Sequence, residues 1–305
     1  MATFLNLQNE VADRLNLSIS VAAELTRIKR WINLAINDIA GRRAWKFLQE
    51  REIVQTVVDI TTGTVDITNG SATVTGSGTA FAAADVRKFI QFEGANDWYE
   101  ITARASTTSI TITPAYGGTT ATGSDYIIRQ FFYPLSTAVA RISDIRQWAT
   151  PRKLTSLGFY TLDLYRPLSN YTGPPQAYAQ YRLDPAVAAT AAKKIQVQFE
   201  PCPDAVYNME VRFLKNLADL SADGDISDIP LNYHLTIADG AEWLGLKYLN
   251  NPAEEKKKEM YEGGIYKMIL EESQLDDWHP VVQSSDDVPY SGFLQFPPGT
   301  FNNSY

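Results

Sequence analysis

The sequence predicts an α+β fold: a helical bundle built from the N- and C-terminal segments, a β-rich middle, and an inserted small β-barrel or sandwich domain. Three observations predict it. Apolar residues recur at helical spacing near both ends of the 305-residue chain, and the spacing changes to alternation from Ile53. Short strand-like runs separated by Gly, Ser, Asn and Thr then fill residues 61–130. We therefore expect a core of residues 1–60 and 131–278, an inserted β domain at 61–130, and an extended C-terminal docking arm at 279–305.

Helical spacing is strongest between Leu25 and Leu48, where the chain is also unusually basic. Six Lys and Arg residues against one Asp give residues 27–46 a local charge of +5, in a chain whose formal charge is −8. The simplest interpretation is an amphipathic helix with a solvated basic face. The alternative is a subunit-interface basic face that meets an acidic surface on a neighbouring chain or partner, through Arg27, Arg30, Arg42 and Arg43.

Four further helices are expected, one of them a short helix in the β-rich middle. Residues 3–17 have the spacing of a short amphipathic helix, and Ser18 or Ser20 would cap the basic helix, with Gly41 marking a kink or an early end. Near the C-terminus, helices are expected over residues 231–249 and 253–275. The first of these would bury Leu231, Leu235 and Leu249, and its Gly240 and Gly245 would admit another helix closely.

Alternating residues predict the strands. A strand is expected over residues 53–58, followed by a hairpin across Asn69-Gly70, a strong short-range hairpin signal. A short helix should begin near Leu154. Further strands are expected at residues 89–92, 98–102, 109–113, 126–129, 177–182, 194–200 and 208–215.

Composition leaves little material for catalysis. Cys202 is the single cysteine and lies between prolines, and His234 and His279 are the two histidines. The Gly-rich run at residues 76–81 lacks the Lys of a phosphate-binding loop, and the acidic run at 221–228 lacks the Glu that completes a calcium loop. Because the usual catalytic and metal-binding side chains are so few, we expect no catalytic residue, no cofactor and no metal. We also expect no membrane partner, because neither a signal peptide nor an apolar span is recognised.

The sequence after Trp278 has a different character. It contains no Lys or Arg and is interrupted by prolines, which disfavour a long helix or a central strand. Aromatic residues spaced along an extended segment can fill pockets on a partner. The candidates for docking on another protein are Tyr290, Phe293, Phe296, Phe301 and Tyr305; the alternative is that the arm packs on its own domain.

The order of several short motifs resembles the tailed-phage head-to-tail adaptor (connector) family, of the tail tubular protein A type. A Gly-Pro-Pro-x-x-Tyr motif precedes a strand that ends in Pro-Cys-Pro-Asp, and an acidic run then leads into a helix rich in small residues. The similarity covers most of the chain, although each motif is short. The matching positions are Gly173, Pro174, Pro175, Tyr178, Pro201, Pro203, Asp204, Leu220, Asp228, Ile229, Pro230, Ala238, Gly240 and Ala241.

This resemblance implies a bacteriophage structural protein without enzymatic activity. Such adaptors form homo-oligomeric rings, usually of twelve subunits, below the portal protein. Their partners are copies of themselves, the portal, a tail or nozzle protein, and genomic DNA that crosses the lumen without specific binding. The expected location is the head–tail junction of the virion, after synthesis in the host cytoplasm. Residues 219–305 carry 16 acidic and 5 basic residues, so an acidic lumen for DNA ejection is available.

Two other functions are considered. The inserted β domain could be a carbohydrate- or receptor-binding tail module, in which Trp98 and Tyr99 would contact the glycan. A cell-wall hydrolase would need paired carboxylates, for which Glu254/Glu255 and Glu271/Glu272 are the candidates. Adjacent acids on a helix point about 100° apart, so a charged solvent-exposed face explains these pairs more simply.

Overall fold

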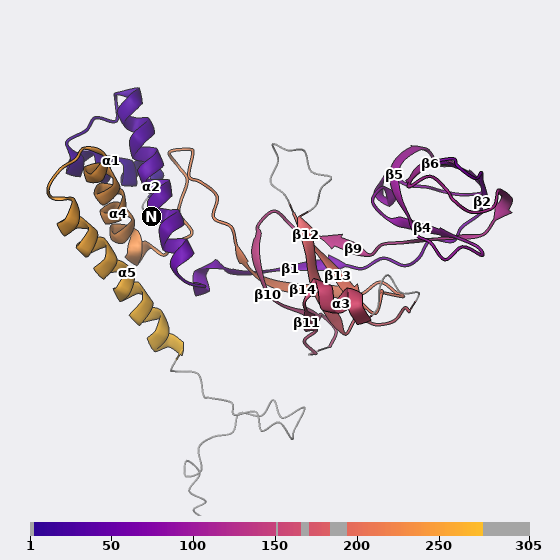
Figure 1. Ribbon diagram of the computed structural model, residues 1–305. Helices are drawn as coiled ribbons and strands as arrows, with labels where there is room; N and C mark the ends of the chain where they lie inside the picture. The colour runs from indigo at the N-terminus through magenta and orange to yellow at the C-terminus, as the bar shows by residue number, and fades with distance from the viewer. Residues whose placement is uncertain (1–2, 151, 166–170, 184–193, 277–305) are drawn as a thin grey trace, which may run out of the picture. The chain divides into compact units, whose positions relative to one another are not determined.

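Helices and strands are separated along the chain in the computed structural model, which describes residues 3–150, 152–165, 171–183 and 194–276. The fold is mixed α+β with a curled β-sheet (Figure 1). Two units divide the chain: a helical unit of residues 1–48 and 217–305, and a β-rich unit of residues 49–216. None of the helices in the described ranges is both long enough and apolar enough to cross a membrane.

Helix α4 (His234–Tyr248) is the centre of the helical unit and packs against the other three long helices. These are α1 (Phe4–Leu15), α2 (Ala22–Arg42) and α5 (Glu254–Asp276), and a 3₁₀ turn, η3 (Leu231–Tyr233), precedes α4. Two glycines of α4 permit this packing, as expected. A Cβ atom on Gly240 would collide with Tyr261 of α5, and one on Gly245 would collide with Leu15 of α1.

Two expectations for the helices, the serine cap and the buried leucines, are wrong in detail, whereas the early end at Gly41 is confirmed. Neither Ser18 nor Ser20 caps α2; Val21 is at the N-cap, and Glu24 instead accepts a 2.6 Å hydrogen bond from the backbone N–H of Ser18. The helix ends at Arg42, directly after Gly41, and a separate 3₁₀ turn, η1, spans Lys46–Leu48. Three of the leucines expected to be buried on α4 and its flanks are exposed, because α1, α2 and α5 cover the side of the helix that carries Ile237, Ala238, Ala241 and Leu246. The exposed leucines are Leu231, Leu235 and Leu249.

The β-rich unit contains two small sheets that share a core. One has the antiparallel order β1-β14-β10, with β1 at Gln49–Gln55, β14 at Asn208–Lys215 and β10 at Val139–Gln147. The other has the order β11-β12-β13-β9, in which only β11 and β12 are parallel. Its strands are Thr155–Leu157, Ala177–Leu183, Ile195–Glu200 and Phe132–Pro134.

Two boundaries in these sheets differ from the expectation. Strand β1 begins at Gln49, four residues before Ile53, because Gln49 already pairs with Leu214. The helix expected from Leu154, α3, spans Phe159–Tyr165 instead, since residues 155–157 pair with β12 as a strand. The alternation of Met209, Val211 and Phe213 does bury one face of β14, as predicted.

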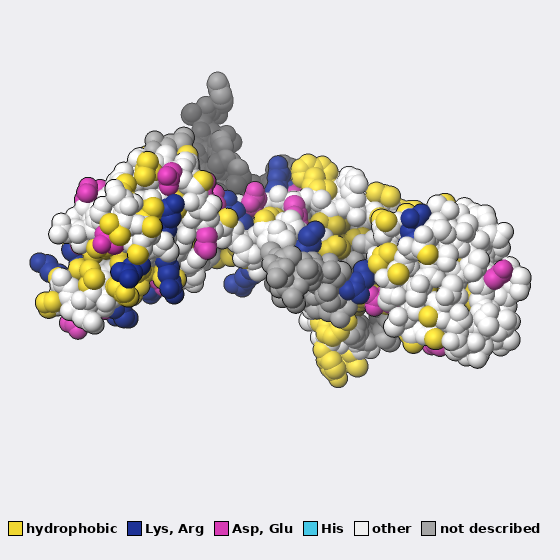
Figure 2. Space-filling model, turned by 90° about the horizontal axis from the view of Figure 1, so that it is seen from above, with side chains coloured by type: hydrophobic (Ala, Val, Ile, Leu, Met, Phe, Trp, Pro, Cys, Tyr) yellow, Lys and Arg dark blue, Asp and Glu magenta, His cyan; other side chains and the backbone are white. Residues whose placement is uncertain are grey.

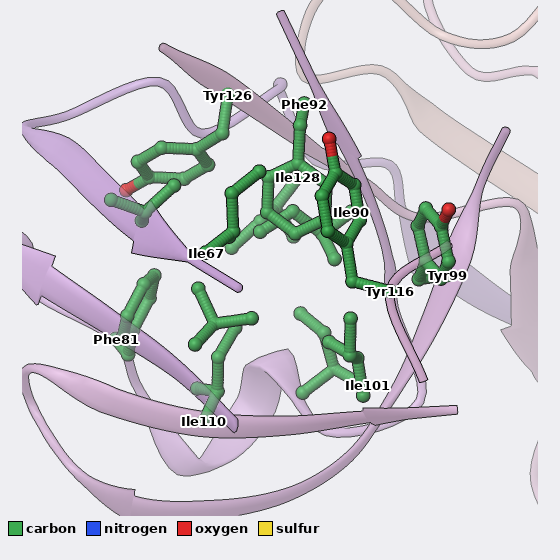
Figure 3. Packing of buried hydrophobic residues seen from close by; sticks show 13 residues of the cluster. Ile67, Phe81, Ile90, Phe92, Tyr99, Ile101, Ile110, Tyr116, Tyr126 and Ile128 are labelled. Carbon is green, nitrogen blue, oxygen red and sulfur yellow. The ribbon is translucent and has the colours of Figure 1, made fainter. Parts of the chain in front are cut away.

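The third sheet has seven strands in the order β7-β2-β3-β6-β5-β4-β8 and confirms the predicted Asn69-Gly70 hairpin between β2 and β3. Gly70 adopts a φ of 77°, which favours glycine. Side chains from six of the strands form a common buried interior, part of which Figure 3 shows. The strands are β2 Thr64–Ile67, β3 Thr73–Ser77, β4 Phe89–Phe92, β5 Tyr99–Ser106, β6 Ser109–Thr113, β7 Ala121–Ser124, which the sequence pattern missed, and β8 Tyr126–Arg129.

Candidate interaction surfaces

Arg42, one of the four predicted interface arginines, binds within its own unit. Its Nη2 atom lies 2.9 Å from Oδ2 of Asp38 and 3.0 Å from Oε1 of Glu262 on α5. Asp38 also accepts a 2.8 Å hydrogen bond from the Tyr261 hydroxyl. The hydrogen bond with Asp38 is the main cause that raises the pKa of Arg42. The Arg42 side chain therefore connects the end of α2 to α5.

Arg43 and the turn that follows α2 are also attached to α5. The Nη1 atom of Arg43 donates to the carbonyl oxygen of Ile269 at 3.2 Å, and its Nε lies 3.8 Å from Oε2 of Glu272. The Glu272 carboxylate is buried and accepts a 2.7 Å hydrogen bond from the backbone N–H of Lys46. Two of the four predicted arginines thus contribute to the packing of the helical unit itself.

Arg27 and Arg30 lie on the exposed side of α2. The guanidinium of Arg27 is 5.0 Å from the centroid of the Tyr248 ring, a cation–π contact with the end of α4. Arg30 is exposed and makes no hydrogen bond or ion pair with any residue in the described ranges. The basic face is therefore divided: Arg42 and Arg43 bind α5, and Arg27 and Arg30 remain on the surface with exposed Tyr248.

The predicted aromatic docking residues of the arm lie outside the described residues, so their role stays a prediction. They are Tyr290, Phe293, Phe296, Phe301 and Tyr305.

A basic surface that sequence reasoning missed lies on the sheet β1-β14-β10. Glu210 of β14 is fully buried, and three arginines surround its carboxylate. Arg146 Nη2 of β10 lies 2.6 Å from Oε2, Arg212 Nε of β14 lies 3.1 Å from Oε1, and Arg51 Nη1 of β1 lies 3.8 Å from Oε1. The Glu210 carboxylate thus pairs with three arginine side chains from three strands.

The charge state of Glu210 follows from these contacts. Burial acts to raise the pKa of Glu210, but hydrogen bonds from Arg146 and Arg212 outweigh it and lower that pKa. Glu210 is therefore ionised at neutral pH, and the cluster keeps an excess of two positive charges. The sequence contained one signal for it: Glu210 and Arg212 alternate with the buried residues of the same strand and must face the opposite side.

Two of the acidic residues that the sequence singled out, Asp225 and Glu271, make structural contacts. In the run at 221–228, the Asp225 carboxylate accepts backbone hydrogen bonds from Ser221 and Ala222, both 2.8 Å long, and the first of these is the main cause that lowers the pKa of Asp225. The Glu271 carboxylate accepts a 2.7 Å hydrogen bond from the Tyr233 hydroxyl, so it points to a different partner from Glu272. Across the described ranges, no three His, Cys, Asp or Glu residues are grouped so that they could hold a metal ion.

Cys202 and His234, the residues with the most reactive side chains, are both buried. Burial raises the pKa of the Cys202 thiol to about 12, so it stays protonated at neutral pH. Nε2 of His234 lies 2.9 Å from the carbonyl oxygen of Ile229, five residues earlier. Both side chains are therefore placed as structural groups.

The aromatic pair considered for glycan binding is largely occupied in packing. Tyr99 belongs to the core of the seven-stranded sheet, as Figure 3 shows. The Trp98 ring lies 5.0 Å from the Phe131 ring and 5.3 Å from the Arg129 guanidinium, measured to the Trp98 centroid. Only a part of Trp98 is left for a ligand, since its side chain is half-buried.

Exposed large hydrophobic residues occur in the described parts of the helical unit and of the two smaller sheets with their loops, but not in the seven-stranded sheet. Residues 61–130, which are all described, expose none, and Figure 2 shows mostly uncharged polar surface over that sheet, whereas the helices show hydrophobic and basic side chains together. Helical spacing puts Tyr266 and Leu270, four residues apart, on one face of α5. The exposed set in the described helical unit is Leu5, Val21, Leu34, Ile226, Leu231, Leu235, Tyr248, Leu249, Met260, Tyr266 and Leu270.

Comparison with known proteins gives no assignment: the chain matches no family model and no curated protein.

Proposed function

We propose that this chain is a virion structural protein of a tailed phage, a head-to-tail adaptor that forms a homo-oligomeric ring between the portal and the tail and leaves a channel for DNA. The proposal combines the order of the sequence motifs with one structural observation. That observation is the set of eleven large hydrophobic side chains exposed on the described part of the helical unit. Large apolar patches on a protein surface commonly mark contacts with other proteins, and we infer that some of these side chains lie together in such contacts.

The distribution of charge supports passage of DNA without retention. The helical unit has 20 acidic and 12 basic residues, whereas residues 49–216 have 15 of each. The whole net charge of −8 therefore belongs to the helical unit. A protein that grips DNA gathers Lys and Arg along the phosphates, and an acidic channel wall would do the opposite.

In this proposal, the four helices form the bundle of an adaptor core and the seven-stranded sheet is a small β-barrel. The sheet order begins with β7 and ends with β8, yet Asp125 alone separates these two strands in the sequence. The two edges of the sheet must therefore approach each other at this corner, which favours closure. The C-terminal arm, 279–305, supplies aromatic anchors for the portal or for an adjacent subunit.

A carbohydrate-binding tail module is the second candidate, but the burial of Tyr99 and the packing of Trp98 make it the weaker one. Glycan binding by a 61–130 fragment, lost on Trp98→Ala, would favour it. The hydrolase alternative has less support, because Glu271 and Glu272 bind different partners. No reaction is part of the proposal.

The direct test is negative-stain electron microscopy of the purified chain mixed with portal rings. The expected result is a second ring stacked coaxially on each portal. Removing residues 280–305 should abolish stable stacking and leave the thermal unfolding of the monomer nearly unchanged. A full-length chain that stays monomeric in the presence of portal would contradict the proposal.

A further inference from the structure

The outer face of the sheet β1-β14-β10 combines positive charge with exposed apolar side chains. Residues that pair directly across antiparallel strands point to the same side, so the register defines this face. The face opposite the buried core carries Arg51, Ile53, Glu210, Arg212, Leu214, Arg141, Asp144, Arg146 and Trp148. Four arginines against two acids give these positions a net charge of +2, in a β-rich unit that is neutral as a whole.

The arrangement of this face is typical of a preformed protein-binding surface. Ile53 is 52% exposed and Trp148 is 47% exposed, and the Arg51 guanidinium lies 5.4 Å from the Trp148 ring centroid. Trp and Arg are the residue types most enriched among residues that dominate binding energy. Because Glu210 fixes Arg146 and Arg212, part of their ordering cost is met before any partner binds.

A complementary surface lies on the helical unit. The loop between β14 and α4 has four Asp residues from Asp219 to Asp228, and no Lys or Arg occurs between Lys215 and Lys247. Three large apolar side chains are exposed in and after this loop: Ile226, Leu231 and Leu235. We call these residues, 219–235, the acidic loop surface. A hollow of about 350 Å³ opens there, lined partly by Ile36, Asp219 and Ile226.

We propose that the outer face of the sheet β1-β14-β10 of one subunit docks on the acidic loop surface of a neighbouring copy of the same chain. This inference rests on the proposed function, since it names the lateral contact of the ring. The two surfaces match in sign of charge, and each has exposed apolar residues. Charge of opposite sign steers the encounter and sets the register, and burial of the apolar residues holds the contact.

A contact between two different surfaces is head-to-tail, and head-to-tail contacts build closed rings when the rotation between subunits closes. DNA is the other anionic candidate for the basic face. It is less suited, because the face exposes Ile53 and Trp148 beside its arginines and the remainder of the chain is acidic. A protein surface that has both carboxylates and apolar side chains can pair with the arginines and also bury Ile53 and Trp148.

The test blocks each surface separately. One variant, Ile53→Glu with Arg141→Glu, changes the sheet face by −3 and leaves the three arginines of Glu210 in place. The other, Asp219→Lys with Ile226→Lys, changes the acidic loop surface by +3. All four residues are exposed. A matched control, Thr107→Glu with Thr119→Glu and Thr122→Glu, adds −3 to exposed positions on the seven-stranded sheet.

Sedimentation velocity on each protein and on their mixture gives the answer. Each blocked variant alone should lose the higher oligomers of the wild type, with association weakened tenfold or more, and the control should assemble normally. Mixed one to one, the two variants should form dimers that do not extend, because each supplies the intact surface that the other lacks. Circular dichroism verifies that both blocked variants fold. If the sheet-face variant does not fold, the milder variant Ile53→Gln with Arg141→Gln replaces it.

Three results would overturn the inference. Normal assembly of the sheet-face variant would exclude this face from the contact, while the proposed ring would stand. Failure of the mixture to form dimers would show that the two surfaces are not partners. If the wild type binds a short DNA duplex and the sheet-face variant loses this binding but still assembles, the face binds nucleic acid instead.

A different result would contradict the proposed function itself: a wild type that remains monomeric even with portal.

Discussion

The helical unit and the seven-stranded sheet are built on the same principle but differ in what they expose. Each buries an apolar core, and the interior of the sheet collects aromatic and β-branched residues from six strands (Figure 3). The sheet exposes no large hydrophobic residue, while the described helices and their loops expose eleven. Both regions can fold by burying their cores, and we propose that the exposed apolar side chains of the helices are where partners bind.

The largest expected effects come from cavities in the two cores, which should act separately. Phe81→Ala in the sheet and Ile32→Ala in α2 each remove a fully buried side chain and should cost about 2–5 kcal/mol. In scanning calorimetry, each should lower the melting temperature of one transition alone. Replacement of residues 63–125 by a Gly-Ser linker should remove the sheet's transition and leave a folded, helix-containing core. If the chain shows a single transition and both substitutions lower its melting temperature equally, the two regions unfold as one cooperative unit, which would contradict this prediction.

The basic face of α2 should separate into structural and surface arginines. Arg43→Glu removes the contacts with Ile269 and the buried Glu272 and places like charges together, at a cost of about 1–3 kcal/mol. Arg30→Glu should stay within about 0.5 kcal/mol of the wild type, since Arg30 is exposed.

Urea unfolding of the two variants measures this difference. If Arg30→Glu alone weakens assembly, and does so most at low salt, Arg30 belongs to an interface. Equal stability of both variants would contradict the structural role given to Arg43.

The exposed leucines of the helical unit should affect assembly more than folding. Leu235→Asp changes a side chain that is 62% exposed, so monomer stability should move by about 0.5 kcal/mol or less. Assembly should weaken about tenfold, because a charge would be buried at the interface. Thr107→Asp on the seven-stranded sheet is the matched control, and light scattering compares the two. An equal effect of both would remove the distinction between the regions.

The smallest expected effect is the pH dependence from Glu210. Since its pKa is lowered in the folded state, Glu210 contributes stability above its ordinary pKa of 4.5, and this contribution is lost as pH falls through the folded pKa. Glu210→Gln should therefore lower the urea midpoint at neutral pH, and the difference from wild type should shrink as the pH falls below 4.5 and through the lowered folded-state pKa. A difference that is constant with pH would mean that the arginine contacts do not depend on its charge.

Local patterns in the sequence predicted most of the secondary structure. The alternation of Met209, Val211 and Phe213 identified β14 and its buried face, and Asn69-Gly70 identified a hairpin. The start of α2 was predicted wrongly, because no serine side chain caps it; the Glu24 carboxylate instead accepts a hydrogen bond from the backbone N–H of Ser18. Propensity indicates which residue types favour a cap but not which group will occupy it.

The contacts of the candidate surfaces depend on register and could not be predicted. Arg51, Arg146 and Glu210 come from three strands separated by 95 and 64 residues, and only the pairing of β1, β14 and β10 brings them together. The charge run on α2 was visible, but the division between Arg30 and Arg43 depends on where α5 packs. Exposure of Leu235 has the same cause, since three helices enclose the other sides of α4.

Hydrogen–deuterium exchange of the assembled chain against the blocked monomeric variant tests the central claim most directly. We expect new protection in the acidic loop surface, at residues 219–235, and in the outer sheet, at residues 49–55, 139–147 and 208–215. Residues 64–129 should exchange alike in both states, because that sheet exposes no large apolar side chain. Protection concentrated in residues 64–129, with the helical unit unchanged, would contradict the account.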